Sequence, residues 1–405
     1  MRTKRFVVFT LLLVVALALS ATLVSAQDAK VIKIASQTPL SGPQSVLGSS
    51  MSNAVALAVE QLSGPLAEAG YKVEYVPFDD QATPDVGVAN ANNLVNDPAI
   101  LAVIGHLNSG VAIPSSEVYD QFNLVMISPA NTNPRITNRG LTTVNRVCGR
   151  DDLQGPTGAR FLAGLGTVSS VYVLHDTTAY GQGVAEFFRV EAEAQGMTVL
   201  GFEGTTEAAN FEGVIQPILA LAPDAIYFGG IYSQTGIFIN QARAAGFSGI
   251  FMGPDGTDSS EFAQLSGEAG VGTYYTSVAG PASIYPNAAQ FVADYNAKFG
   301  EDPQPFAAQS YDATAIALNA ILEAATIAGD VPSRAAVASV VRSTTGYEGL
   351  TGTVTFDAYG DPEVGLYYVI QVGSSDPAAW GGNTLLETLE IPSPFKVLSD
   401  SMMGG

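Results

Sequence analysis

Short apolar runs alternate with longer Ala-rich segments along the chain from Val31 onward. The runs are rich in Val, Ile, Tyr and Phe and have the length of strands, whereas the segments between them have helical spacing. Such alternation is typical of parallel sheets covered by helices. It predicts strands at 31–36, 72–78, 100–105, 124–129, 170–176, 197–202, 224–230, 249–254 and 272–278, with helices at 52–62, 84–96, 181–195 and 235–246.

The strand–helix series is expected to occur twice. Residues 142–156, "TTVNRVCGRDDLQGP", interrupt the alternation with charged and turn-forming residues, and a new series follows. We interpret this segment as a crossing between two lobes. Helices at 287–300 and 310–329 and strands at 352–362 and 365–372 come after both series, so they must pack on one of them, and more than one crossing is expected.

The predicted fold is therefore α/β, with two similar lobes, each a parallel sheet flanked by helices, joined by hinge crossings. The first lobe is predicted to be discontinuous and the second to end in an extended tail that wraps the lobe and then frays. The predicted ranges are a signal peptide at 1–26, a first lobe at 27–149 and 278–355, and a second lobe at 150–277 and 356–405.

The N-terminus has the three-part layout of a secretory signal. Arg2, Lys4 and Arg5 precede an apolar run from Phe6, and small residues end the run at Ala26. The alternative is an uncleaved anchor, because the run approaches the length that crosses a bilayer. Either interpretation predicts an exported protein at the periplasmic or extracytoplasmic face.

Composition excludes several classes of function. The 405 residues are 47% hydrophobic and carry a formal net charge of −21, so binding to nucleic acid or to an anionic membrane surface is disfavoured. Loss of the three N-terminal cations would bring the charge to −24. Cys148 is the single cysteine, which leaves no internal disulfide and no multi-cysteine metal site, and we expect it to be a buried apolar side chain.

Reacting groups of the usual kinds are absent from the sequence. There is no G-x-S-x-G elbow, no G-x-G-x-x-G turn and no phosphate-binding loop, and the two histidines, His106 and His175, stand alone at strand ends, where structural hydrogen bonds are expected. The pairs Asp79–Asp80 and Asp151–Asp152 are interpreted as solvated loop acids. We therefore expect no enzymatic activity, no metal site and no cofactor. An exported hydrolase is the weakest alternative, because the sequence lacks the nucleophile and base that hydrolysis requires.

The stretch "GHLNSG" follows the predicted strand 100–105 and raises the possibility of a binding site. Ligands of open parallel sheets bind at the carboxyl ends of strands. Ser109 is placed there, before a predicted helix, so its hydroxyl and the adjacent N–H groups could hold an anion. The alternative is that Ser109 only caps the helix.

Several strings in the same order resemble the Leu/Ile/Val-binding protein family, the solute-binding subunits of branched-chain amino-acid ABC transporters. The resemblance extends from about Val31 to about Val372. It is carried by "TPLSGPQSVLG", "PFDDQATPDVGVANANNLVND", "VIGHLNSG", "MISPANTNP", "DDLQGPTGAR", "LHDTTAYGQG", "YFGG", "QARAAG" and "FMGPDGT". It implies a type I periplasmic-binding fold.

The resemblance also implies a binding site for the two charged ends of an amino acid. Ser109 and Thr132, with backbone groups around Ala130, would hold the α-carboxylate, whereas Tyr180 and Asp255 from the second lobe would close on it, with Asp255 meeting the α-ammonium. Leu47, Ile231 and Asn131 depart from the family pattern, and Phe306 would supply an apolar wall. The remaining candidates are the loop residues Leu107 and Asn108; Ala82 and Asn108 replace cysteines of members that have a disulfide.

The resemblance therefore predicts an extracytoplasmic solute-binding protein of an ABC importer. Its ligand is expected to be an amino acid, branched-chain or otherwise apolar, and its partner a membrane permease, with the protein itself a monomer. The alternative is a ligand-binding sensor, or an importer subunit for amides or other small polar solutes.

Overall fold

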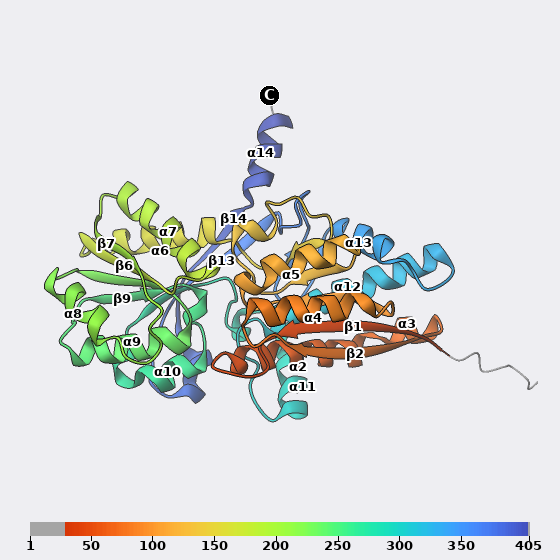
Figure 1. Cartoon of the computed structure of the whole chain (residues 1–405), viewed down its shortest axis with the longest axis horizontal. Coiled ribbons are helices and arrows are strands. Elements are labelled where there is room, and N and C mark those ends of the chain that lie inside the picture. Colours follow the sequence, from red (N-terminus) through yellow and green to blue (C-terminus); the bar gives the residue numbers. More distant parts are fainter. Residues whose placement is uncertain (1–28, 404–405) are drawn as a thin grey trace, which may run out of the picture.

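The computed structural model describes residues 29–403, and the predicted signal peptide at 1–26 lies outside the described residues. Two sheets, one parallel and one mostly parallel, lie side by side along the long axis of the molecule, each with helices on both faces (Figure 1). Within residues 29–403 no helix is both long and apolar enough to cross a membrane.

The first sheet has five parallel strands in the order β2-β1-β3-β4-β5. Alternate side chains of β1 explain its two-sided burial: Ile32 and Ile34 pack toward one helical layer and Ala35 toward the other. The elements of this series are β1 Lys30–Thr38, α2 Ser45–Leu62, α3 Gly64–Glu68, β2 Tyr71–Asp79, α4 Pro84–Asn96, β3 Ile100–Gly105, α5 Ser109–Gln121, β4 Val125–Ser128, the 3₁₀ turn η1 Pro134–Ile136 and β5 Val144–Arg146.

The second sheet has seven strands in the order β14-β13-β10-β9-β8-β6-β7. Strands β6 to β10 are parallel, and α6 and α7 cover one face while α8, α9 and α10 cover the other. The elements are α6 Asp151–Gly164, β6 Ser170–His175, α7 Ala179–Ala194, β7 Thr198–Gly204, α8 Glu212–Ala220, β8 Ala225–Gly229, α9 Tyr232–Ala244, β9 Ile250–Gly253, η2 Asp255–Thr257, α10 Ser260–Ser266, η3 Gly267–Gly270 and β10 Tyr274–Ser277.

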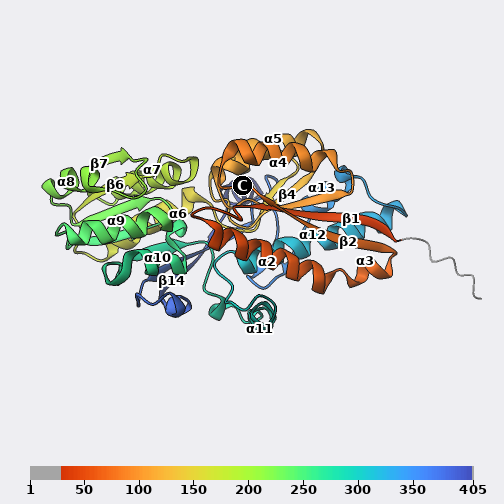
Figure 2. The same ribbon diagram turned by 60° about the horizontal axis from the view of Figure 1, so that its bottom comes forward.

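The chain then returns to the first lobe, which makes that lobe discontinuous. Helix α12 packs against α2, and Ile316 and Ile321 of α12 share a core cluster with β1 and β3 (Figure 2). The elements are η4 Ala282–Ile284, α11 Ala288–Phe299, α12 Ala307–Ala328, α13 Arg334–Arg342, β11 Tyr347–Glu348 and β12 Thr353–Val354. These positions support the predicted lobe boundaries, which we propose for the protein.

The C-terminal segment differs from the extended wrap that the sequence predicted. After the predicted strand β13 Val364–Gln371 and the 3₁₀ segment η5 Pro377–Gly382, strand β14 Thr384–Pro392 pairs antiparallel with β13 along its length. Helix α14 Pro394–Met403 follows and projects from the body of the molecule (Figure 1). The exposed alternation of β14 is typical of an edge strand, which buries too little apolar surface to give a strong sequence signal.

Two further predictions of secondary structure were wrong. Residues 142–156 are not only a turn-rich crossing, because they contain strand β5 and the start of α6. The predicted strand 352–362 contains only the two residues of β12, because Asp357 accepts hydrogen bonds from the N–H groups of Tyr359 and Asp361 and turns the chain.

A buried ion-pair network joins two of the crossings between the lobes. Arg146 at the end of β5 and Arg150 in the first crossing both pair with Asp361 in the last crossing, each with an N–O distance of 2.5 Å. Arg146 is fully buried, and its guanidinium also donates to the carbonyls of Asn131 and Asn133. The network fixes the loop after β4 to the hinge region.

Candidate functional site

A small cavity lies between the two lobes, where the carboxyl ends of both parallel sheets face each other. Open α/β sheets bind ligands at this edge. Both lobes contribute side chains, and Phe306 at the start of α12 completes the wall. The lining residues are Leu47, Leu107, Asn108, Ala130, Tyr180, Ile231, Asp255, Gly256 and Phe306. A wider cleft adjoins it and is lined by Ser109 as well as by Asn108, Tyr180 and Ile231.

The first-lobe side of the cleft includes the N-terminus of α5. Ser109 is the first residue of this helix and is buried, and its Oγ accepts a hydrogen bond from the N–H of Asn133 at 3.4 Å rather than capping α5. Asn108 precedes the helix without a side-chain cap and donates from Nδ2 to Gln44. The first turn of α5 therefore directs its backbone N–H groups toward the cleft.

The loop after β4 supplies the other first-lobe groups. Ser128 Oγ accepts hydrogen bonds from the N–H groups of Ala130 and Asn131 and donates to the side chain of Asn131. Asn131 in turn accepts from the N–H of His106. Asn131 is thus a buried structural residue. Thr132 is also buried, with its hydroxyl lacking a hydrogen bond among the described residues, and neither residue lines the small cavity or the wider cleft.

The second lobe contributes a hydrogen-bonded pair. The Tyr180 hydroxyl, at the start of α7, donates to Asp255 Oδ1 over 2.6 Å and accepts from the N–H of Gly256 over 2.6 Å. A Cβ on Gly256 would lie 2.5 Å from the carbonyl oxygen of Gly230, so glycine is required for this approach. Thr178 caps α7 by accepting from the N–H of Gly181, which fixes the position of Tyr180.

Burial determines the electrostatics of this pair. Asp255 is 3% exposed, and desolvation raises the pKa of its carboxyl to about 6, although the hydrogen bond from Tyr180 opposes the shift. The pKa of Tyr180 is raised well above its usual value, first by burial and then by the charge of Asp255. Asp255 is therefore ionised at neutral pH and can accept hydrogen bonds from a cation.

The structure also shows which sequence-based interpretations of acids and histidines hold. His106 is buried and hydrogen-bonded to Asp80 at 3.1 Å, and Cys148 is buried, as expected. Asp80 and Asp151 are both fully buried, so their interpretation as solvated loop acids was wrong. Gly256 lines the small cavity but was not predicted as a site residue. The burial of Asp80 and Asp151 was missed because it depends on packing between distant segments.

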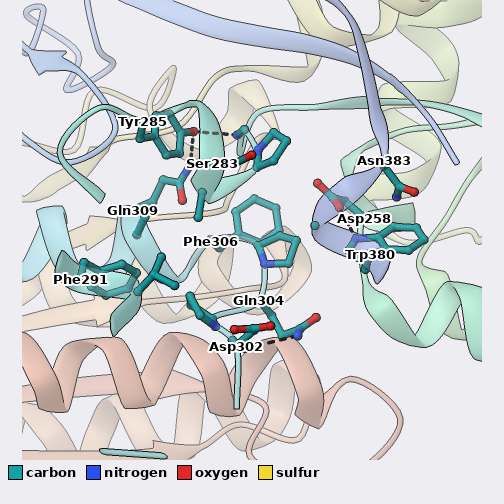
Figure 3. A pocket seen from close by; sticks show the side chains of 18 of the residues that line it. Asp258, Ser283, Tyr285, Phe291, Asp302, Gln304, Phe306, Gln309, Trp380 and Asn383 are labelled. Atoms are coloured by element: carbon teal, nitrogen blue, oxygen red, sulfur yellow. Dashed lines mark hydrogen bonds between the residues drawn. The ribbon is translucent and has the colours of Figure 1, made fainter. Parts of the chain in front are cut away.

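A larger cavity of about 740 Å³ lies on the other side of Phe306 (Figure 3). Asp258, Trp380 and Asn383 line one side of it, and Tyr285, Phe291 and Gln309 line the other. Asp258 accepts hydrogen bonds from Trp380 Nε1 and from Ser277 Oγ, both at 2.9 Å. Its carboxylate is thus already bonded within the protein. Among the described residues no group of three or more acidic, histidine or cysteine side chains could hold a metal ion.

Asp258 should make the stability of the protein depend on pH. Burial raises the pKa of its carboxyl to about 7 in the folded protein, whereas an unfolded aspartate has a pKa near ~3.9. The folded state therefore binds the proton more tightly, and its stability falls as pH rises between these values, by up to ~1.4 kcal/mol per pH unit. We expect Asp258→Asn to lose less stability between pH 5 and pH 7.5 than the wild type, as measured by urea unfolding.

The neutral amide of Asp258→Asn imitates the protonated carboxyl, so the comparison isolates this group from Asp255 and Asp176, whose pKa values of about 6 act in the same direction. Equal loss of stability in both proteins would show that Asp258 does not titrate in this range.

The two lobes touch each other across the cleft. Asn133 Nδ2 in the first lobe donates to the carbonyl of Ala179 in the second over 2.6 Å. Ser260 Oγ at the start of α10 donates to Gln304, which precedes α12, over 2.9 Å. The two lobes are thus in direct contact beside the small cavity.

Comparison with known proteins agrees with this architecture. The periplasmic binding protein family model matches residues 31–377. A leucine-, isoleucine-, valine-, threonine- and alanine-binding protein of Pseudomonas aeruginosa is 31% identical over 336 residues, which cover 82% of this chain and 87% of that protein.

Solved structures are similar over most of their length. A leucine-binding protein from Thermotoga maritima aligns with a TM-score of 0.79 and 27% identity, covering 90% of this chain and 99% of that one. An ABC transporter substrate-binding protein from Desulfitobacterium hafniense, solved in complex with Leu, aligns with a TM-score of 0.72 and 25% identity, covering 88% of this chain and all of that one.

Proposed function

The chain belongs to the periplasmic binding protein family, and from this premise we propose that it is the extracytoplasmic solute-binding subunit of an ABC importer. Its ligand is an amino acid with a branched-chain or other apolar side chain, held between the two lobes. The observation that carries this proposal is the position of Asp255 across an apolar cavity from the first-lobe donors. One end of the site accepts hydrogen bonds and the other donates them, as a zwitterion requires.

The ammonium end is formed by Asp255. Its carboxylate lies in the cavity wall, ionised at neutral pH and held by Tyr180. A charge-assisted hydrogen bond to such a group contributes roughly 1.5 to 3 kcal/mol. The relatives whose names include leucine or related amino acids support this assignment.

The carboxylate end is formed by the first lobe. The N-terminus of α5 at Ser109 carries the positive end of a helix dipole, and Ala130 contributes to the cavity wall. Thr132 follows in the same loop, and its buried hydroxyl makes no hydrogen bond among the described residues. We propose that Ser109, Thr132 and the backbone near Ala130 hold the α-carboxylate.

The ligand's side chain would contact an apolar wall. Leu47, Leu107 and Ile231 line the cavity together with Phe306. These side chains offer no hydrogen bonds, so a polar or charged side chain would lose its hydration without compensation. We therefore propose selection of apolar amino acids.

Binding is proposed to favour the closed state because the ligand contacts both lobes there and chiefly one lobe in an open state. The closed protein would then dock on a membrane permease outside the cytoplasm. The predicted signal at 1–26 would direct the export that this requires.

A ligand screen tests the proposal directly. Bound ligand raises apparent stability by mass action, so leucine, isoleucine, valine or alanine at millimolar concentration should raise the melting temperature of the protein that begins at Gln27. Calorimetry then measures affinity. Leucinamide, which lacks the carboxylate, and 4-methylpentanoate, which lacks the ammonium, are controls that should bind at least tenfold more weakly than leucine.

Stabilisation by an amide or organic acid but by none of the twenty amino acids would contradict the ligand class. The protein would then be an importer subunit or a sensor for other small polar solutes.

A further inference from the structure

We propose that the larger cavity beside Phe306 is a second binding site, for a small organic ammonium ion with an apolar body, and that its ligand strengthens amino-acid binding at the first site. The second site is argued from the cavity itself. The coupling between the two sites rests on the proposed function.

The cavity has the size and the walls of a small-molecule site. Its volume of about 740 Å³ lies within the range of roughly 300 to 1,000 Å³ that is usual for ligand pockets. Aromatic rings from both lobes line it (Figure 3). They are Tyr275 and Trp380 in the second lobe and Tyr285, Phe291 and Phe306 in the first, and all five residues are buried. The apolar body of a ligand would therefore exchange water for contact with these rings.

The charges around the cavity favour a cation. Two carboxylates, Asp258 and Asp302, are among the lining residues, and none of the described residues that line it is a lysine, an arginine or a histidine. Asp258 is 4% exposed, whereas Asp302 is an exposed residue on the first-lobe side. Both carboxylates would repel an anion, and the faces of aromatic rings attract a cation as well.

Asp258 can still accept hydrogen bonds from a ligand. Its two oxygens each accept one bond at 2.9 Å, from Trp380 Nε1 and from Ser277 Oγ. Both donors are neutral, and Asp258 makes no ion pair within residues 29–403. An ionised carboxylate has about four acceptor positions, so an ammonium group could bind beside these donors. It would supply the counter-ion that this buried acid lacks.

Asp258 is ionised at slightly alkaline pH. Burial raises the pKa of its carboxyl to about 7, and the charge of Asp255 adds to the shift while hydrogen bonds to its oxygens oppose it. Tyr275 and Tyr285 stay neutral, because burial raises their pKa values well above the usual value. The remaining titratable group of the cavity is Asp302. The site is therefore expected to bind cations best above pH 7.

The second-lobe wall includes a segment that lies beyond the family match. The match ends at residue 377, whereas Trp380 lies in η5 and Asn383 directly follows it. Trp380 stacks on Tyr275 with a ring-centroid distance of 5.8 Å and also packs against Phe262 at 6.0 Å. The cavity thus depends on the C-terminal segment of this chain, and it is separate from the site that the resemblance implied.

A ligand in this cavity would contact both lobes at once. Asp258 and Trp380 belong to the second lobe, and Phe291 and Gln309 belong to the first. Both lobes also line the small cavity, and Phe306 lines both cavities. The two ligands would therefore favour the same arrangement of the lobes. Such linkage is reciprocal, so each ligand raises the affinity for the other.

The experiment is calorimetry with three probes that share a phenyl ring and differ in charge. They are 2-phenylethylamine, 2-phenylethanol and 3-phenylpropanoate, each titrated into the protein that begins at Gln27. The buffer is phosphate at pH 8, because Tris is itself an organic cation, and an alkylammonium such as that of lysine keeps its proton at this pH. Each titration is run without amino acid and with saturating leucine, isoleucine, valine or alanine, whichever binds most tightly.

Two variants separate the charge of Asp258 from general effects of removing a buried acid. Asp258→Asn removes the proposed counter-charge and keeps a side chain of nearly the same shape. Asp176→Asn is the matched control, because Asp176 is also buried and has a pKa raised to about 6, but it lines the wider cleft instead.

We expect the wild type and Asp176→Asn to bind 2-phenylethylamine about tenfold or more tightly than 2-phenylethanol, with 3-phenylpropanoate the weakest. Asp258→Asn should bind the amine about tenfold more weakly than the wild type. Bound amino acid should raise the affinity of the wild type for the amine about fivefold or more. The three probes test the site on the wild type even if Asp258→Asn does not fold.

The outcomes separate the site, the coupling and the proposed function. Equal affinity of the wild type for the amine and the alcohol, or equal affinity of the wild type and Asp258→Asn for the amine, would overturn the site. Displacement of the amine by the amino acid would place the amine in the first site and overturn the second. An amine affinity that the amino acid leaves unchanged would overturn the coupling. If no amino acid binds, the proposed function and the coupling both fail, whereas the titrations without amino acid still decide whether the cavity binds the amine.

Discussion

Asp255→Asn will weaken the binding of an apolar amino acid by at least tenfold. The amide has nearly the same shape as the carboxylate and can keep the hydrogen bond from Tyr180, so the change removes the negative charge and little else. Loss of a charge-assisted hydrogen bond costs roughly 1.5 to 3 kcal/mol, and 1.4 kcal/mol corresponds to about a factor of ten in Kd. Calorimetry at pH 7.5 measures this directly.

The pH dependence of binding provides a second measure of the same group. Because the pKa of Asp255 is about 6, its charge is lost as pH falls through this value, and the affinity of the wild type should decrease below it. Asp258→Asn is the matched control, since Asp258 is also buried but faces the larger cavity. Unchanged affinity in Asp255→Asn would remove Asp255 from the ligand site.

Arg146→Met will destabilise the protein by about 3 to 5 kcal/mol. Arg146 is fully buried and pairs with Asp361, and its guanidinium donates to the carbonyls of Asn131 and Asn133. Methionine fills much of the same space, but one of the two cations of Asp361 is lost, and the carbonyls of Asn131 and Asn133 each lose a charged hydrogen-bond donor. Removal of one partner from a buried pair has this large effect because the remaining groups stay desolvated.

The midpoint of urea unfolding measures this effect. Arg160→Met is the control, because Arg160 is 57% exposed and its pair with Glu191 should contribute less than ~1 kcal/mol. The two lobes can unfold separately, so probes in both lobes are required. A midpoint of Arg146→Met equal to that of the control would show that the network does not stabilise the fold. Ligand affinity of Arg146→Met should also fall, since the guanidinium holds the loop on either side of Thr132.

The sequence predicted the parallel strands well because their signal is local. Runs such as residues 100–105 are apolar throughout, as strands buried on both faces must be, and the structure has β3 at these positions. Strands β5 and β14 were missed for the opposite reason: β5 has three residues and β14 is largely exposed, so neither has a strong hydrophobic pattern. Their pairing partners lie elsewhere in the chain.

The candidate site was likewise predicted only in part from the sequence. Most residues that the family resemblance suggested, including Leu47, Tyr180 and Asp255, line one cavity, although ligand contact by each stays a prediction. The burial of Asp151 could not be read from the sequence, because an Asp–Asp pair before a helix is usually exposed. Its backbone N–H bonds to the carbonyl of Thr132 in the first lobe, and such a contact between the lobes depends on the assembled fold.

The return of α12 to the first lobe has a consequence for the order in which the protein folds. Its residues Ile316 and Ile321 share a core with Ile32 and Ile34, so this core joins segments that lie more than half the chain apart. During synthesis β1 to β5 must wait for α12 and α13, whereas β6 to β10 form a contiguous series. Closure of such a long loop is entropically costly and slow. The part of the second lobe from β6 to β10 can thus form before the first lobe is completed, and the exposed apolar face of β1 and β3 needs protection until then.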